Sequence, residues 1–250
     1  MIADAIASET LFDSIVNHGK NSILGGTVFE KPYPHLIFEN FFADDVYRRL
    51  IGHRPDLSQY RDLNGARTRK QYTLWDRQVE AGDSERTQLW RTVSDAVSAP
   101  EIEAALRERL RSGLKIRQKA SGEPWPVPMF PQPVLYADFD GYAIKPHPDT
   151  RRKVLTMQIY LPADDSQRAL GTTIYKISPM GVFAWKSYGL TKDKTLPFLP
   201  NSGYAFVVIH PAYSLLKSSW HGREAISVPV DKPRLSILNT YYRELPQAGA

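Results

Sequence analysis

The residues that could hold a metal ion in this chain are histidines and carboxylates, because the sequence contains no cysteine. His147 and Asp149 are separated by one residue. In an extended segment residues i and i+2 project to the same side, so this imidazole and this carboxylate can converge on one point. Taken alone, the triplet is also typical of a turn in which Asp149 caps a loop and His147 faces solvent.

A second histidine, His221, lies about seventy residues further along the chain, and Arg234 follows it after about a dozen, with Ser236 two residues on. A metal held by two imidazoles and one carboxylate keeps one face of its coordination sphere open. An arginine nearby supplies a fork of donors that matches a carboxylate and stays charged. This order of residues resembles that of non-haem iron enzymes that need both a metal and an anchored dicarboxylate, and it implies such a site here.

In these motifs the sequence resembles the Fe(II)- and 2-oxoglutarate-dependent dioxygenase superfamily, in its prolyl-hydroxylase-like branch. The resemblance spans about residues 30–245. Other segments are similar to successive strands of that branch: 32–42, 158–162, 171–175 and 201–206. Each segment alone is weak evidence of the resemblance, but together the segments are specific to that family.

The resemblance implies a site and a reaction. The expected ligands of Fe(II) are His147, Asp149 and His221. The expected contacts of the cosubstrate 2-oxoglutarate are Arg234, Ser236 and Tyr136, although Tyr136 equally suits a core aromatic. The implied reaction consumes O2, releases succinate and CO2, and oxidises an aliphatic C–H of a small-molecule substrate. Halogenating relatives replace the carboxylate with a small residue, so the presence of Asp149 favours hydroxylation.

A competing pair of residues has the same spacing. His210 and Arg223 are as far apart as His221 and Arg234. Arg223, however, is followed by Glu224 and has no serine two residues on, so we expect His210 to be structural. The basic run 151–153 is either a solvated turn or a contact for an anionic substrate. The insert 178–200, which contains Trp185, Lys186 and Tyr188, is long enough to form a lid.

The first half of the chain is predicted to be mainly helical. Helical spacing covers 3–16 and 84–97, and a Ser98–Glu101 capping box predicts a further helix to about Arg111. A short apolar run at 34–42 predicts a strand that leads into a helix from Asp45. Residues 55–70 are polar and are predicted to form a loop.

The pattern changes after the proline-rich stretch 123–133, in which proline disfavours regular structure. Runs of β-branched and aromatic residues then predict strands at 134–139, 153–161, 172–177, 204–209, 225–230 and 234–242. We expect a mainly β fold with flanking helices. Residues 1–250 would form one domain, with a helical support and one leading strand in 1–120 and a double-stranded β-helix (jelly-roll) catalytic core in 121–250.

Composition excludes several classes of protein. The chain has 250 residues, 42% of them hydrophobic, and a net charge of +5, which is too small a surplus to indicate nucleic-acid binding. Nucleic-acid demethylases of the superfamily carry a second arginine six residues after the first, where this chain has Thr240. No apolar run is long enough for a membrane span, and the N-terminus does not have the pattern of a signal peptide, so we expect a cytoplasmic protein.

A non-catalytic alternative remains open at this stage. A cupin-like barrel that binds a small acid or a sugar could retain the same histidines and aspartate. Iron-dependent formation of succinate would distinguish the oxygenase from such a binding protein.

Overall fold

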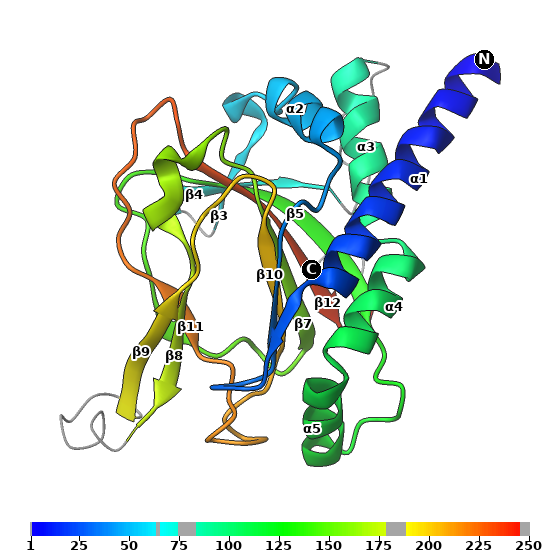
Figure 1. Cartoon of the computed structure of the whole chain (residues 1–250). Coiled ribbons are helices and arrows are strands. Elements are labelled where there is room, and N and C mark those ends of the chain that lie inside the picture. The colour runs from blue at the N-terminus through cyan, green and yellow to red at the C-terminus, as the bar shows by residue number, and fades with distance from the viewer. Residues whose placement is uncertain (1, 64–65, 75–83, 179–188, 246–250) are drawn as a thin grey trace.

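Two antiparallel sheets face each other, and helices cover the outer face of the larger sheet (Figure 1). The computed structural model describes residues 2–63, 66–74, 84–178 and 189–245. The larger sheet has the order β1 (Thr27–Phe29), β2 (His35–Phe38), β10 (Gly203–Val207), β7 (Lys153–Tyr160), β12 (Arg234–Tyr242), β5 (Phe130–Asp138), β4 (Ala66–Thr73) and β3 (Arg61–Leu63). The smaller sheet has the order β6 (Ile144–His147), β11 (His221–Arg223), β8 (Thr173–Ile177) and β9 (Leu190–Thr195).

The helices pack on one face of the larger sheet and form the main core with it. They are α1 (Ile2–Gly25), α2 (Asp44–Gly52), α3 (Glu85–Val97), α4 (Pro100–Arg109) and α5 (Arg111–Ser121), with short 3-10 helices at Leu57–Gln59 and Asp165–Leu170. Trp90 of α3 and Leu106 of α4 are buried in the same cluster as Leu135 of β5 and Ile159 of β7. The helical layer therefore braces the sheet from behind and leaves its other face free to line a site.

Alternation along the central strands separates the core from that site. In β7, Leu155, Met157 and Ile159 belong to the helix-facing core. Thr156 and Gln158, the residues between them, line a cavity between the sheets. Successive side chains of a strand point to opposite faces, so one strand supplies both a hydrophobic layer and a polar lining.

The structure confirms the mainly β architecture and several elements expected from the sequence. The predicted helices at 84–97 and after Asp45, and the predicted strands at 134–139, 153–161, 172–177, 204–209 and 234–242, correspond to α3, α2, β5, β7, β8, β10 and β12. The N-terminal helix extends beyond the expected end at residue 16 to Gly25. Besides these helices, residues 1–120 contribute β1 to β4 to the larger sheet.

Other local predictions are wrong, and tertiary pairing explains most of them. Within the predicted loop at 55–70, residues 61–63 and 66–70 lie in strands, because β4 pairs with β5 and carries β3 at the sheet edge. The proline-rich stretch ends inside β5, where Pro131 and Pro133 pair with β12 but precede the segment that pairs with β4. Proline is tolerated at such an edge, where its missing N–H breaks no ladder bond.

Two more boundaries differ from the prediction. Residues 225–230 are not a strand. Ile226 and Val228 are buried against Tyr142. The backbone of Ile226 accepts a hydrogen bond from Gly141 N–H and donates one to the carbonyl oxygen of Tyr142, without forming a strand. The predicted capping box is absent, since α4 begins at Pro100 after an Ala99 cap that makes no side-chain hydrogen bond.

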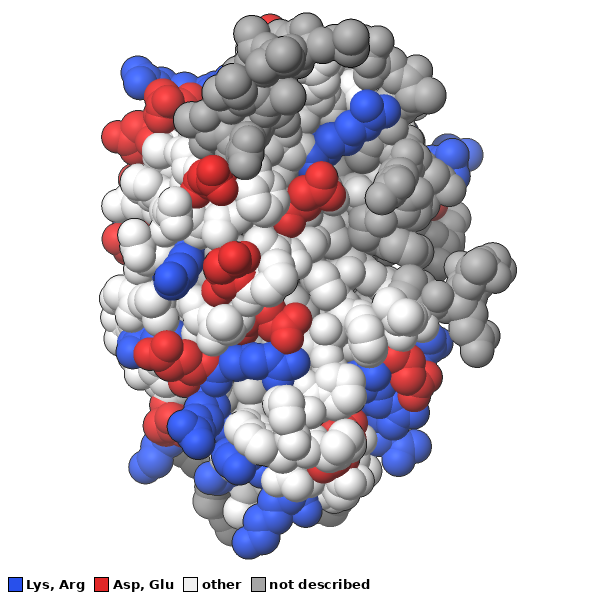
Figure 2. Space-filling view, turned by 90° about the vertical axis from the view of Figure 1, so that its right-hand side faces the viewer, with Lys and Arg blue, Asp and Glu red and all other residues white. Residues whose placement is uncertain are grey.

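The helix-covered side of the molecule carries acidic and basic side chains interspersed, as Figure 2 shows. No helix among the described residues has the length and apolar character needed to cross a bilayer. The predicted lid lies partly outside the described residues, which include neither Trp185, Lys186 nor Tyr188. The end of that insert forms β9, which pairs with β8.

Candidate metal centre and its cavity

The structure brings together His147, Asp149 and His221, the three residues that the sequence predicts to bind a metal. One ligand atom from each lies within 4.8 Å of the others. His147 ends β6 and His221 begins β11, and the two are direct partners in the smaller sheet. Their ring centroids are 4.4 Å apart. Antiparallel pairing thus places two imidazoles side by side, and the turn after β6 brings Asp149 to them.

Backbone hydrogen bonds orient both imidazoles. Nδ1 of His147 lies 3.0 Å from the carbonyl oxygen of Lys145, and Nδ1 of His221 lies 3.0 Å from that of Ser219. A carbonyl oxygen only accepts, so each Nδ1 donates, and Nε2 of the neutral ring keeps a free lone pair. Such a bond on the second ring nitrogen is the usual support of a metal-binding histidine.

Electrostatics holds His221 and Asp149 in the protonation states that a cation requires. Burial lowers the pKa of His221 to about 4, so its imidazole is neutral at neutral pH. Burial opposes ionisation of Asp149, but Lys153 and His221 outweigh it and lower the pKa of Asp149 to about 2. Lys153 Nζ donates to Asp149 Oδ1 at 2.7 Å, and Thr156 Oγ1 donates to Oδ2 at 2.9 Å. Two imidazoles, each with its Nδ1 held by a backbone carbonyl, and an oriented carboxylate are a donor set that fits a divalent first-row metal.

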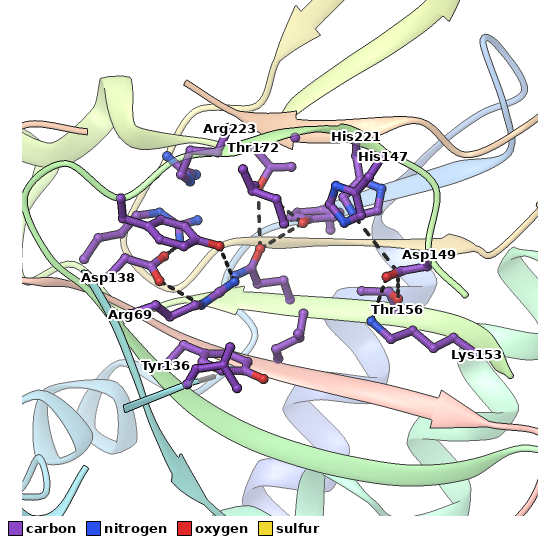
Figure 3. A pocket seen from close by; sticks show the side chains of 18 residues that line it. Arg69, Tyr136, Asp138, His147, Asp149, Lys153, Thr156, Thr172, His221 and Arg223 are labelled. Atoms are coloured by element: carbon purple, nitrogen blue, oxygen red, sulfur yellow. Dashed lines mark hydrogen bonds and ion pairs between the residues drawn. The ribbon is translucent and has the colours of Figure 1, made fainter. Parts of the chain in front are cut away.

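The three side chains lie at one end of a cavity of about 190 Å³ between the sheets (Figure 3). Asp138, Arg69 and Arg223 lie at the other end (Figure 3). The wall between the ends is polar. It includes Gln158, Thr172 and Tyr204, which hydrogen-bond to one another.

Arg234, the predicted carboxylate anchor, lines this cavity and is 1% exposed. Its Nη1 donates to Asp138 Oδ2 at 2.8 Å, and its Nε donates to the carbonyl oxygen of Leu170 at 2.8 Å. Its Nη2 is buried and has no partner. The guanidinium is therefore held firmly from one side and keeps one donor without an acceptor.

Arg69, Asp138 and Arg234 form one row across three strands. Asp138 of β5 is the register partner of Arg69 in β4 and of Arg234 in β12. Arg69 Nε lies 2.9 Å from Asp138 Oδ1, close enough for an ion pair although not aligned as a hydrogen bond. Arg69 also hydrogen-bonds to the hydroxyl of Tyr142. One buried carboxylate thus serves two guanidinium groups.

The other predicted cosubstrate residues differ in their access to the cavity. Tyr136 lines it, with the guanidinium of Arg69 4.1 Å from the centroid of its ring. Ser236 is fully buried and accepts a hydrogen bond from Gln158 Nε2 at 2.8 Å. Ser236 is therefore linked to the cavity by Gln158, which lines it.

Arg69, Asp138 and Arg223 were missed as site residues by the sequence reasoning. Asp138 follows Tyr136 by two residues on one strand, so strand periodicity was a usable signal for it. Arg69 lay in a segment assigned to a loop, and its place depends on the pairing of β4 with β5. Arg223 follows His221 by two residues in β11, a spacing that puts both on one face.

His210 does not take part in the candidate metal site. Its Nδ1 accepts a hydrogen bond from the backbone N–H of Ala212 at 3.1 Å. The group of potential ligand atoms contains His221 instead. In the basic run 151–153, Lys153 contacts Asp149, whereas Arg151 and Arg152 are exposed.

No family model matches the sequence, and no curated protein matches it closely enough to count as a relative. The chain is similar to several solved structures at low identity. One is a prolyl-4-hydroxylase from Pseudomonas putida, with 14% identity and a TM-score of 0.48 over 95% of this chain and 99% of that chain.

A second is HygX from Streptomyces hygroscopicus with nickel and 2-oxoglutarate bound, with 9% identity and a TM-score of 0.48 over 83% of this chain and 82% of that chain. A third is SnoN, a non-heme α-ketoglutarate-dependent epimerase from nogalamycin biosynthesis, with 16% identity and a TM-score of 0.46 over 98% of this chain and 92% of that chain. At such scores these similarities decide nothing about chemistry, and the function proposed for this chain rests on its own residues.

Proposed function

We propose that this chain is an Fe(II)- and 2-oxoglutarate-dependent oxygenase that hydroxylates an aliphatic C–H of a small-molecule or amino-acid-like substrate. The observation that carries the proposal is the convergence of His147, Asp149 and His221 at one end of a cavity whose other end holds the buried Arg234. A metal site alone suits many proteins. A metal site facing a buried arginine suits a ligand that chelates with one end and carries an anionic group at the other.

The order of the strands supports a jelly-roll core. Strands β5, β12, β7 and β10 lie together in the larger sheet, and β6, β11, β8 and β9 form the smaller one. Chain connections repeatedly cross from one sheet to the other, as in a double-stranded β-helix. The metal ligands then sit on the smaller sheet and its turn, while the arginine that would hold the cosubstrate lies on the larger one.

Iron with 2-oxoglutarate and O2 would supply the oxidising chemistry, in which the oxo acid loses CO2 to become succinate and the substrate gains a hydroxyl group. The protein binds and orients. His147 and His221 would offer Nε2 to the ion, and Asp149 would offer a carboxylate held in place by Lys153 and Thr156. These supports keep the ligands in position before the ion binds, so little rearrangement is needed.

Arg234 would hold the far carboxylate of 2-oxoglutarate, with Tyr136 and Ser236 as predicted neighbours. Its partners Asp138 and Leu170 hold the guanidinium but leave Nη2 available for an acceptor. A water molecule occupies about 30 Å³ in the liquid, so the cavity of about 190 Å³ has room for a small acid. The bulk of the primary substrate would then enter from the mouth of the cavity.

Iron-dependent succinate formation tests the proposal. The protein is loaded with Fe(II) without oxygen, given 2-oxoglutarate and a panel of candidate substrates in air, and assayed for succinate and for products heavier by one oxygen. His221→Ala should abolish both metal binding and succinate formation. His210→Ala is the matched control, because His210 has the same spacing to an arginine but lies outside the metal site.

The outcomes separate the oxygenase from a binding protein. Succinate that requires Fe(II) and is lost in His221→Ala supports the proposal. A parent protein that binds one equivalent of metal and a small acid but forms no succinate with any substrate would instead be a non-catalytic barrel. Equal activity of His221→Ala and the parent would remove His221 from the site.

A further inference from the structure

Three guanidinium groups in the cavity each have a nitrogen without a hydrogen-bond partner, but that of Arg69, Nε, lies 2.9 Å from Asp138 Oδ1, and within the described part of the chain only two such nitrogens have no carboxylate beside them. These atoms are Nη2 of Arg223 and Nη2 of Arg234. Both residues line the same cavity, and they are 6% and 1% exposed. A buried donor without an acceptor costs on the order of 1–3 kcal/mol, more when the group is charged. Two such donors at one end of one cavity indicate that a ligand supplies their acceptors.

We propose that Arg223 and Arg234 together clamp the far carboxylate of the 2-oxo acid, and that Arg223 thereby makes the site selective for dicarboxylic over monocarboxylic oxo acids. This inference rests on the proposed function, because it assigns a further residue to the same cosubstrate. Arg223 is a positioning and specificity residue in this scheme, with no role at the metal.

The two arginines approach the cavity from opposite sheets. Arg234 begins β12 in the larger sheet, and Arg223 ends β11 in the smaller one. Arg223 reaches inward from the strand above the cavity in Figure 3, whereas Asp138 and Arg69 lie below it. A carboxylate has two oxygens, so one anion between the sheets can accept from both guanidinium groups at once.

The balance of charge at this end of the cavity favours an anion. Asp138 is the carboxylate that lines this end, and it is already shared by Arg69 and Arg234. Three guanidinium groups against one carboxylate leave two positive charges in excess. Among the described residues, no carboxylate forms an ion pair with Arg223, so a bound carboxylate would reduce the repulsion between Arg223 and Arg234.

The acidic neighbour of Arg223 does not neutralise it. Glu224 lies at the next position in the chain, is 72% exposed at its side chain, and pairs with Lys192 Nζ at 3.3 Å. Neighbouring residues of an extended chain point to opposite sides, which separates this carboxylate from the cavity. Arg223 lines both this cavity and the neighbouring hollow that contains Arg168, and among the described residues no carboxylate pairs with it on either side.

Binding of two oxo acids to the Ni(II)-loaded protein tests the clamp without turnover. 2-Oxoglutarate and 2-oxopentanoate have the same chain length and the same chelating end, but 2-oxopentanoate has no far carboxylate. Calorimetric titration of the parent should show 2-oxoglutarate binding at least about a hundredfold more tightly, because the second ligand leaves the buried donors unpaired. Arg223→Gln should weaken 2-oxoglutarate about tenfold to a hundredfold and leave the affinity for 2-oxopentanoate unchanged.

Two further variants complete the test. Arg223→Lys keeps a positive charge without the fork of donors and should lose an intermediate amount of 2-oxoglutarate affinity. Arg168→Gln is the matched control, because Arg168 is an exposed arginine on a neighbouring hollow, and it should bind both oxo acids as the parent does. An unchanged affinity for 2-oxopentanoate also shows that each variant is folded.

The clamp is wrong if Arg223→Gln binds 2-oxoglutarate within twofold of the parent, or if it loses affinity for both oxo acids equally. It is also wrong if the parent binds the two acids equally well, although the proposed function would survive that result. A different result would refute the proposed function: neither oxo acid would bind the metal-loaded parent. The proposed clamp would then be wrong as well.

Discussion

Replacing Asp138 with asparagine should destabilise this protein far more than the same change in an exposed ion pair. The carboxylate of Asp138 is completely buried, and it lies 2.8 Å from Arg234 Nη1 and 2.9 Å from Arg69 Nε. The side chain of Arg234 is 1% exposed and that of Arg69 is 15% exposed, so water cannot solvate the positive charges that the variant would leave unpaired. The Asp138→Asn variant keeps the volume of the side chain and removes only its charge.

The size of the effect follows from burial. Removing one partner of a buried ion pair costs about 3–5 kcal/mol, because the remaining charge is left uncompensated. For a domain of this size each kcal/mol lowers Tm by about 2–4 °C, which predicts a fall of about 6–20 °C. The matched control is Asp165→Asn. Asp165 lies 3.5 Å from Arg168, with side chains 68% and 61% exposed, and an exposed pair contributes about 0–1 kcal/mol.

Urea unfolding of the metal-free proteins, followed by circular dichroism, measures both changes in the free energy of unfolding. We expect Asp138→Asn to lose at least about 3 kcal/mol more than Asp165→Asn. If the two variants lose the same amount within error, then Asp138 is not the counter-charge of the buried arginines. The charge balance described for the cavity would then be wrong.

Three further expectations concern the site. Arg234→Ala should raise the 2-oxoglutarate concentration needed for half-maximal succinate formation well over tenfold, since a buried charge-assisted pair contributes about 2–5 kcal/mol. Calorimetry should show that the variant still binds metal. An unchanged 2-oxoglutarate requirement would remove Arg234 from the site. Burial lowers the pKa of His35 and of His221 from 6.5 to about 4. The metal-free protein should therefore keep its stability above pH 6.5 and lose it toward pH 4, at about 1.4 kcal/mol per pH unit for each imidazole. Urea unfolding midpoints that stay constant between pH 6.5 and pH 4 would contradict the burial of these imidazoles. Asp149→Gly should lose hydroxylation because a ligand of the ion is gone. In saturating chloride, mass spectrometry should find no chlorine in the product of the parent protein. Chlorination by the parent, or full activity of the variant, would show that Asp149 is not a ligand.

Some of the local predictions failed for a reason that lies outside the segments concerned. Nothing in the polar residues 66–73 indicates a strand, and they form one because β5 offers a free edge with which they pair. The apolar residues 225–230 look like a strand by composition, but they pack against Tyr142 without joining a sheet. Pairing partners are chosen by the whole fold, and a window of sequence does not contain them.

The sequence by itself determined the composition of the candidate metal site. His147 and Asp149 are two residues apart, and the local geometry of an extended chain is enough to bring their side chains to one side. The order of His221 and Arg234 after them indicated the remaining groups. In β7 the alternation of apolar and polar residues likewise separates the helix-facing side chains from those that line the cavity, because the period of a strand is a local property.

Only the tertiary structure decided how the far end of the cavity is charged. Arg69, Asp138 and Arg234 meet because three strands pair in one particular register, and Arg223 faces them from the other sheet. The sequence separations between these residues carry no information about that register. Burial then turns the contacts into strong interactions, since charges removed from water must find partners in the fold or in a ligand.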